Sequence, residues 1–124
     1  MLPFNIDILL SSVGEDGHVA SLFPFDDALY ETERLVVPVI APKSPSCRLT
    51  ITPKVIKSAK SIFVLAVGEK KGEILGEALN NPHNIFELPV RLTIGSTWIL
   101  DKSATKSFKA ANQNNHHNTR ILYA

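Results

Sequence analysis

Two side chains that can exchange a proton lie close together in the first twenty residues. Asp16 and His18 are separated by one residue within Gly14-Glu15-Asp16-Gly17-His18. An imidazole takes a proton from water near neutral pH, and a nearby carboxylate orients the ring and stabilises its charged form. The two glycines permit positive φ angles and close approach of a ligand to the backbone. The pattern predicts a pocket with a histidine base, although on spacing alone an ordinary turn with a solvated histidine is the commoner explanation.

Strands and helices must hold this loop in place. Phe4–Leu10 is a short apolar run and predicts a buried strand, followed by a loop over Ser11–His18. The continuous apolar run Ile62–Val67 is typical of a parallel strand covered on both faces. The other expected elements are a helical turn at Val19–Phe23, strands at Leu35–Ile40 (an edge strand because of Pro38), Arg48–Thr52 and Thr97–Leu100, and helices at Pro53–Ala59, at Glu69–Leu79 and from the N-cap Asp101 through Ala110.

Strands alternating with helices predict an α/β fold with three layers, a mostly parallel sheet flanked by helices. In such folds ligands bind beyond the carboxyl ends of the strands, where the loops Ser11–His18 and Gly68–Lys71 are expected. We expect residues 1–110 to form this partial Rossmann-like domain. Residues 111–124 are expected to form a polar, disordered tail, in which Ile121–Tyr123 could dock onto the domain.

Composition limits the class of protein. The 124 residues carry a net charge of +1, from 13 basic and 12 acidic side chains. This near-balance excludes a protein whose main function is to bind nucleic acid through a strongly basic surface. No apolar run approaches the length of a membrane span, and no secretory leader is recognised. The single Cys47 cannot form an internal disulfide, and no Cys/His group has zinc spacing. We therefore expect no metal, no cofactor, no membrane and a reducing cytoplasmic setting.

Several segments together resemble a known family. Asp7–Leu10, Gly14–His18 and Ala20–Pro24 are similar to the signature of the 6-phosphogluconolactonases, which belong to a wider group with glucosamine-6-phosphate isomerase/deaminase. Further matches follow in the same order, at Pro45–Thr52, Val67–Lys71 and Thr97–Asp101. The resemblance covers nearly all of residues 5–110 but only the C-terminal half of the usual family domain.

The resemblance implies hydrolysis of 6-phospho-D-glucono-1,5-lactone to 6-phosphogluconate, a step of the oxidative pentose phosphate pathway. His18 falls on the base that activates water, and Asp16 on the residue that orients this base or contacts the sugar. Gly14 and Gly17 would lie against the substrate, and backbone N–H groups of their loop are candidates for stabilising the oxyanion. The cations implied for the phosphate are Arg48 and Lys71, with Lys43, Ser44 and Lys70 as weaker candidates.

Departures from the family pattern leave alternatives open. Phe23 stands where the deaminase branch has a glutamate, and because phenylalanine carries no proton this favours the lactonase. Ser12 replaces a usual glycine and would be strained if its φ were positive. The family's Gly-Gly-Ser phosphate loop and Asp-Glu-Arg segment are absent. The chain is thus expected to be a half that needs a partner chain to supply the N-terminal half, a decayed remnant that binds a sugar phosphate or partner without catalysis, or a partial sequence.

Overall fold

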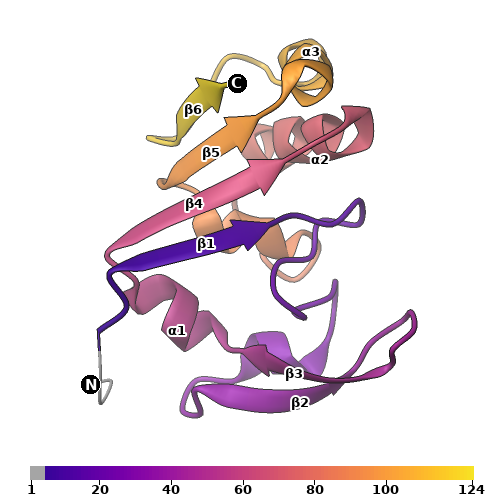
Figure 1. Cartoon of the computed structure of the whole chain (residues 1–124), viewed down its shortest axis with the longest axis vertical. Helices are drawn as coiled ribbons and strands as arrows, with labels where there is room; N and C mark the ends of the chain where they lie inside the picture. Colours follow the sequence, from indigo (N-terminus) through magenta and orange to yellow (C-terminus); the bar gives the residue numbers. More distant parts are fainter. Residues whose placement is uncertain (1–4) are drawn as a thin grey trace.

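The computed structural model describes residues 5–124, which contain one parallel and one antiparallel sheet (Figure 1). The parallel sheet has the order β1-β4-β5-β6, and the smaller sheet pairs β2 with β3. This confirms the α/β class with a mostly parallel sheet. The elements are β1 (Ile8–Ser12), β2 (Val36–Ile40), β3 (Cys47–Ile51), β4 (Ser61–Ala66), β5 (Thr97–Leu100), β6 (Arg120–Tyr123), α1 (Pro53–Ser58), α2 (Glu69–Asn80), α3 (Lys102–Ala111) and the 3-10 helices Asp27–Tyr30 and Pro89–Thr93.

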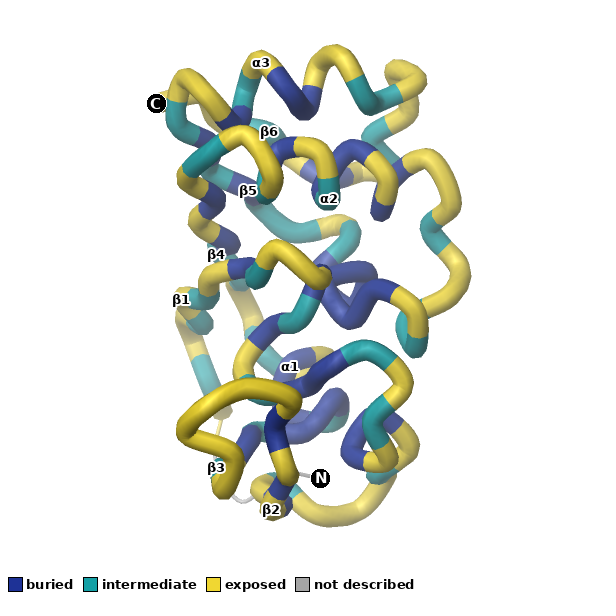
Figure 2. The backbone as a smooth tube through the Cα atoms, turned by 90° about the vertical axis from the view of Figure 1, so that its right-hand side faces the viewer, coloured by how far each residue is buried: buried dark blue, intermediate teal, exposed yellow. Residues whose placement is uncertain are grey.

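The helices cover one face of the parallel sheet. Along the chain, β4, β5 and β6 are each added to the same side of the growing sheet, which starts at β1. Crossovers between parallel strands are right-handed, so crossovers that all run in one direction across the sheet lie on the same face. Figure 2 shows α2 and α3 on the same side of the strands. Residues 5–124 therefore supply two of the three expected layers. The expectation that Ile62–Val67 is covered on both faces is wrong, since Leu65 is 39% and Val67 68% exposed.

The core lies between the sheet and these helices. Alternate residues of β4 and β5 point into it, and Trp98 is fully buried with its indole N–H donating to Thr93 Oγ1 at 3.0 Å. α2 and α3 pack closely because Gly72 has no side chain: a Cβ there would lie 2.1 Å from the carbonyl oxygen of Ala104. The guanidinium of the buried Arg91 donates to the carbonyl oxygens of Ala78 at 3.3 Å and Asn84 at 2.9 Å, which satisfies groups where α2 ends.

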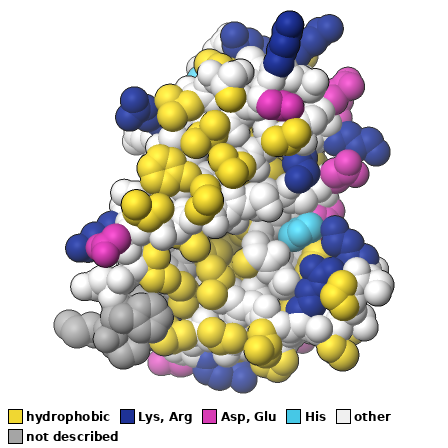
Figure 3. Space-filling view, viewed as in Figure 1, with side chains coloured by type: hydrophobic (Ala, Val, Ile, Leu, Met, Phe, Trp, Pro, Cys, Tyr) yellow, Lys and Arg dark blue, Asp and Glu magenta, His cyan; other side chains and the backbone are white. Residues whose placement is uncertain are grey.

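The opposite face of the parallel sheet is apolar and uncovered. The register places Leu10 beside Phe63, and Leu65 beside Ile99, which lies beside Leu122. Figure 3 shows apolar side chains gathered over these strands. We call this surface the bare face; it comprises Ile8, Leu10, Phe63, Leu65, Val67, Ile99 and Leu122. The edge of β1 away from β4 is also unpaired within residues 5–124. Broad apolar surfaces of this kind mark interaction sites.

Some boundaries differ from the sequence-based expectations. β1 begins at Ile8 and continues through Ser12, whereas Phe4, where the strand was expected to start, lies outside the described residues. Ser12 has strand backbone with no positive φ, so serine is not strained there. Residues Val19–Phe23 form no helical turn but a tight turn closed by a bridge between Val19 and Leu22. The end of the tail is ordered, because β6 pairs with β5, which confirms the alternative that Ile121–Tyr123 docks onto the domain.

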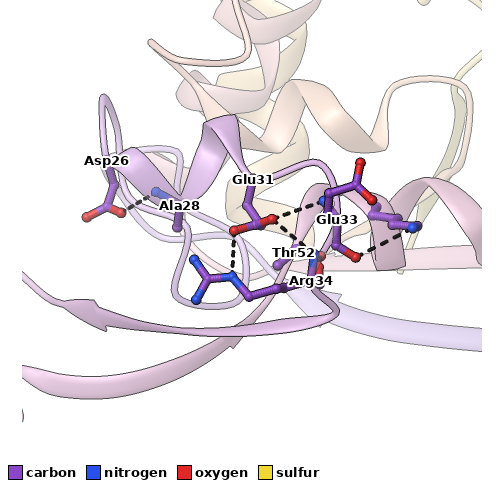
Figure 4. A network of polar contacts seen from close by, with 7 residues as sticks. Asp26, Ala28, Glu31, Glu33, Arg34 and Thr52 are labelled. Carbon is purple, nitrogen blue, oxygen red and sulfur yellow. Dashed lines mark hydrogen bonds and ion pairs between the residues drawn. The ribbon is translucent and has the colours of Figure 1, made fainter.

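A polar network fixes the antiparallel sheet to the rest of the molecule (Figure 4). The Glu31 carboxylate accepts from the backbone N–H of Glu33 and of Arg34, both at 3.0 Å, and from Arg34 Nε at 2.8 Å. These bonds lower the pKa of Glu31 from 4.5 to about 2. Thr52 Oγ1 donates to the carbonyl oxygen of Arg34 at 2.7 Å. The start of β2 is thus tied to the start of α1, which determines where the β2–β3 hairpin and its Arg48 lie.

Candidate functional site

The glycine-rich loop leaves the carboxyl end of β1, as expected, and is held by its own backbone. The N–H of Gly14 donates to the carbonyl oxygen of His18 at 2.9 Å, and the N–H of Gly17 donates to that of Gly14 at 3.0 Å. Gly17 has a φ of 88°, a conformation that favours glycine, and its carbonyl oxygen accepts from Val90 N–H at 2.9 Å. The loop is therefore a closed turn anchored to the 3-10 helix Pro89–Thr93.

This turn brings Asp16 and His18 into direct contact. Asp16 Oδ1 lies 2.5 Å from His18 Nδ1 and also accepts the backbone N–H of His18 at 3.1 Å. Burial raises the pKa of Asp16, but the hydrogen bonds from the His18 side chain and backbone, together with the charge of His18, outweigh it and lower the pKa below the ordinary 3.8. An ionised carboxylate only accepts hydrogen bonds, so in the neutral imidazole Nδ1 carries the proton and Nε2 carries the lone pair. The pair is arranged as an oriented base with a counter-charge.

Gly14 leaves room for the histidine ring, a role that adds to its expected place beside the substrate. It lies against the histidine ring, and a Cβ at this position would be 2.1 Å from both Cε1 and Nδ1 of His18. The same Cβ would be 2.9 Å from Asp16 Oδ1. Only glycine therefore leaves room for the Asp16–His18 pair in this geometry.

A cavity of about 400 Å³ opens in front of the pair. Five of the residues predicted from the sequence line it, namely Gly14, Asp16, His18, Lys71 and the weaker candidate Lys43. The remaining lining residues are Ser12, Val13 and Glu15. The cavity thus combines a base with two ammonium groups from separate segments, the start of α2 and the loop between β2 and β3. Such a combination suits a small anionic ligand.

The lysines around the cavity differ in whether a carboxylate already pairs with them. The exposed Lys70 pairs with Glu15 at 3.9 Å, whereas within residues 5–124 no carboxylate lies within 4.0 Å of the amines of Lys71 or Lys43. Lys71 and Lys43 therefore keep their charge for a ligand. The sequence indicated Lys43 only as a weaker candidate in the loop that leads to Arg48, and the folded hairpin places it at the cavity.

Two predicted site residues do not line the cavity wall. Gly17 is buried and packs on Leu88, where an added Cβ would lie 2.7 Å from Cδ2. Arg48 is not among the lining residues, and its Nε donates to the carbonyl oxygen of Pro45 at 2.7 Å. Its guanidinium carbon is 5.4 Å from the ring centroid of Phe23, and that ring is 4.5 Å from the ring of His18. Arg48 thus reaches the site through Phe23, a contact that sequence spacing did not reveal.

The loop has few free donors for an oxyanion. The N–H groups of Gly14, Gly17 and His18 all donate to acceptors within the loop itself. In this conformation the N–H groups of Gly14 and Gly17 are already engaged, and oxyanion stabilisation by other N–H groups of the loop stays a prediction. The ammonium groups of Lys43 and Lys71 are positive groups at the cavity. Within the part of the chain that the structure describes, no three His, Cys, Asp or Glu side chains cluster as metal ligands, and no helix is long and apolar enough to cross a membrane.

Comparisons with known proteins identify relatives of this chain. The 6-phosphogluconolactonase of Streptomyces coelicolor is 38% identical over 104 residues, and that of Homo sapiens is 36% identical over 105; each alignment covers 81% of this chain and 40% of the relative. The chain therefore spans about 40% of the length of the curated relatives it matches. The solved 6-phosphogluconolactonase of Trypanosoma cruzi is 32% identical, with a TM-score of 0.66 over 82% of this chain and 41% of that one.

A deaminase structure shares the fold at lower identity. A monomeric glucosamine-6-phosphate deaminase aligns with a TM-score of 0.66 over 82% of this chain at 19% identity, which concerns the fold alone. The family model described as glucosamine-6-phosphate isomerases/6-phosphogluconolactonase matches residues 3–99. The chain therefore belongs to the glucosamine-6-phosphate isomerase/6-phosphogluconolactonase family.

Proposed function

We propose that this chain carries the catalytic histidine of a lactone hydrolase, which converts 6-phospho-D-glucono-1,5-lactone to 6-phosphogluconate. The contact between Asp16 and His18 at the wall of a cation-lined cavity carries the proposal. The curated relatives named 6-phosphogluconolactonase, each sharing more than a third of the aligned residues, support the choice of substrate. The expected compartment is the cytoplasm.

The reaction needs a base, an attack and a proton return. Nε2 of His18 accepts a proton from water while the water oxygen bonds to the lactone carbonyl carbon. Asp16 stabilises the imidazolium that forms, because its carboxylate is fixed on Nδ1. The oxyanion then collapses, the ring C–O bond breaks, and the departing alkoxide takes the proton back from Nε2. The product is the open-chain acid, so one water is consumed and the base is regenerated.

The phosphate would be held by the free cations around the cavity. Lys71 and Lys43 line it with unpaired ammonium groups, and Arg48 lies beside it on Phe23. A phosphate dianion binds lysine as a point charge and arginine through paired N–H donors. Gly14 leaves room for the imidazole of His18, whereas Gly17 packs on Leu88 and anchors the turn. The aromatic ring of Phe23 in contact with His18 offers no proton donor, which disfavours the isomerase or deaminase reaction.

The bare face supports a second candidate, in which this chain is a half-enzyme or a binding fragment. Leu10 is 63% and Ile8 67% exposed, although both lie on β1 of a parallel sheet. Parallel sheets normally have both faces covered. We infer that a partner chain supplying the missing N-terminal half would cover this face and bring the phosphate loop that is absent from residues 1–124.

One experiment addresses both candidates. Hydrolysis of the lactone is measured above its spontaneous rate for the purified chain, alone and with the N-terminal half of the S. coelicolor relative added. His18→Ala is the catalytic control. Excess hydrolysis that His18→Ala removes supports the lactonase, and dependence on the added half supports the half-enzyme. Spontaneous rates in every mixture, with 6-phosphogluconate binding retained, would leave the non-catalytic binding fragment.

A further inference from the structure

One buried aromatic ring contacts both the base and the nearest arginine. The Phe23 ring centroid lies 4.5 Å from that of His18, with the two planes inclined at 36°, and 5.4 Å from the guanidinium carbon of Arg48. Phe23 itself is only 3% exposed. An aromatic ring in this place joins two polar groups that come from different elements, the loop after β1 and strand β3.

The backbone holds Phe23 firmly in this position. It follows the tight turn in which Leu22 N–H donates to the carbonyl oxygen of Val19 at 2.9 Å. Its own carbonyl oxygen accepts from Asp26 N–H at 3.1 Å, and Pro24 restricts the backbone of the residue before it, which is Phe23. The ring is therefore a fixed surface against which the two polar side chains can be placed.

His18 needs a second restraint besides Asp16. The hydrogen bond at Nδ1 selects the tautomer but leaves the imidazole able to swing about that single contact. Gly14 limits this movement near Cε1 and Nδ1, and the Phe23 ring limits it on another part of the imidazole. A base whose Nε2 must meet a water molecule within hydrogen-bond reach depends on such restraints.

Arg48 depends on the same ring. Its Nε is occupied by the carbonyl oxygen of Pro45, and no carboxylate among residues 5–124 pairs with its guanidinium. A guanidinium is attracted to the face of an aromatic ring, which fixes its plane without neutralising its charge. Arg48 is thereby positioned while its charge stays free for an anion.

We propose that Phe23 is a positioning residue that holds the imidazole of His18 and the guanidinium of Arg48 in one arrangement. Its consequence for catalysis rests on the proposed lactone hydrolysis. The positioning itself is a property of the chain without substrate. Phe23 touches neither lactone nor water in this proposal and acts only through the two side chains that it contacts.

The test uses Phe23→Leu and Phe23→Met, which remove the ring but keep apolar bulk. Phe108→Leu is the matched control, because Phe108 is 1% exposed and its ring also lies beside a histidine, 5.6 Å from His116, away from the site. The first readout is hydrogen exchange of the Nδ1 proton of His18, followed by NMR. The second is the affinity for inorganic phosphate, followed at the Nε–H of Arg48.

Loss of the ring is expected to speed exchange of the His18 proton at least tenfold and to weaken phosphate binding at least threefold, with Phe108→Leu like wild type. In the hydrolysis assay the Phe23 variants should lower kcat and raise KM together, since base and cation are both displaced. Unchanged exchange and phosphate affinity in whichever Phe23 variant folds would overturn the proposal. A wild-type chain without hydrolase activity, both alone and with the N-terminal half added, would contradict the proposed function, while exchange and phosphate binding would still decide the role of Phe23.

Discussion

Replacing Gly14 with alanine should disable the base while leaving the anion-binding groups in place. The new Cβ would stand 2.1 Å from Cε1 and Nδ1 of His18, whereas ordinary van der Waals contact begins at 3.4 Å. Because the clash is with the ring itself, the imidazole must move. Gly14 has no positive φ, so alanine adds no backbone strain that would confuse the result.

The size of the effect follows from that displacement. Moving a catalytic group by roughly 1 Å costs about 100-fold in rate, or about 2.7 kcal/mol of transition-state stabilisation. We expect Gly14→Ala to lower kcat for lactone hydrolysis by about this factor. KM should change little, because Lys43 and Lys71 come from other segments and do not contact the new methyl group.

The matched control for this prediction is Gly95→Ala. Gly95 has a φ of 91° and no atom within 4 Å of its added Cβ, so alanine there strains the backbone without a clash. We expect it to lower the free energy of unfolding by about 1 kcal/mol and to leave kcat unchanged. Steady-state hydrolysis and urea unfolding of both variants are the measurements. A Gly14→Ala protein with kcat within twofold of wild type would refute the steric reasoning.

Three further predictions concern the parts that support the site. Arg91→Leu should lower the free energy of unfolding by about 3 kcal/mol in urea titrations, because the carbonyl oxygens of Ala78 and Asn84 lose the guanidinium donor; stability equal to wild type would contradict this role. Glu31 has its pKa lowered to about 2, so its contribution is complete above about pH 4.5 and is lost as the pH falls through 2. Glu31→Gln should therefore flatten the fall in stability between pH 4.5 and 2, and an unchanged slope would count against the network. Leu10→Lys on the bare face should abolish activation by an added N-terminal half, whereas the control Ile40→Lys on the antiparallel sheet should not; equal activation of both would locate docking elsewhere.

The fold was largely predictable wherever the signal was local. The apolar run in β4, the amphipathic pattern of α2 and the N-cap Asp101 of α3 were confirmed with boundaries shifted by only a residue or two at each end. These features depend on side-chain periodicity and on hydrogen bonds within a few residues. The antiparallel strand with Pro38 was also predicted as an edge strand, since proline donates no ladder hydrogen bond.

Features that depend on what lies beside a segment were not predictable. The continuous apolar run Ile62–Val67 predicts a strand that is buried on both faces. Which face is covered depends on where the helices pack, and within residues 5–124 the helices lie on one face. β6 has only four residues and follows a polar stretch, so it is stabilised mainly by its pairing with β5. The hydrophobic pattern of a helix or strand indicates which of its residues are buried, but it does not indicate which other element packs against them.

The candidate site also has some features that were predictable from the local sequence and others that were not. Asp16 and His18 could be paired from their spacing and from the family resemblance, and the 2.5 Å contact agrees with that pairing. The reason for Gly14 could not be foreseen, because it depends on where the imidazole returns in space. Lys43 and the Phe23–Arg48 contact likewise depend on how the hairpin folds back over the loop.

The central claim is that His18, fixed by Asp16, removes the proton from the attacking water. The most direct measurement is the rate of lactone hydrolysis above the spontaneous background, compared between the wild-type chain and His18→Ala under the conditions in which the wild type is active. The account predicts that His18→Ala removes the excess rate while Lys71 and Lys43 still bind 6-phosphogluconate. An excess rate that survives in His18→Ala would contradict the account.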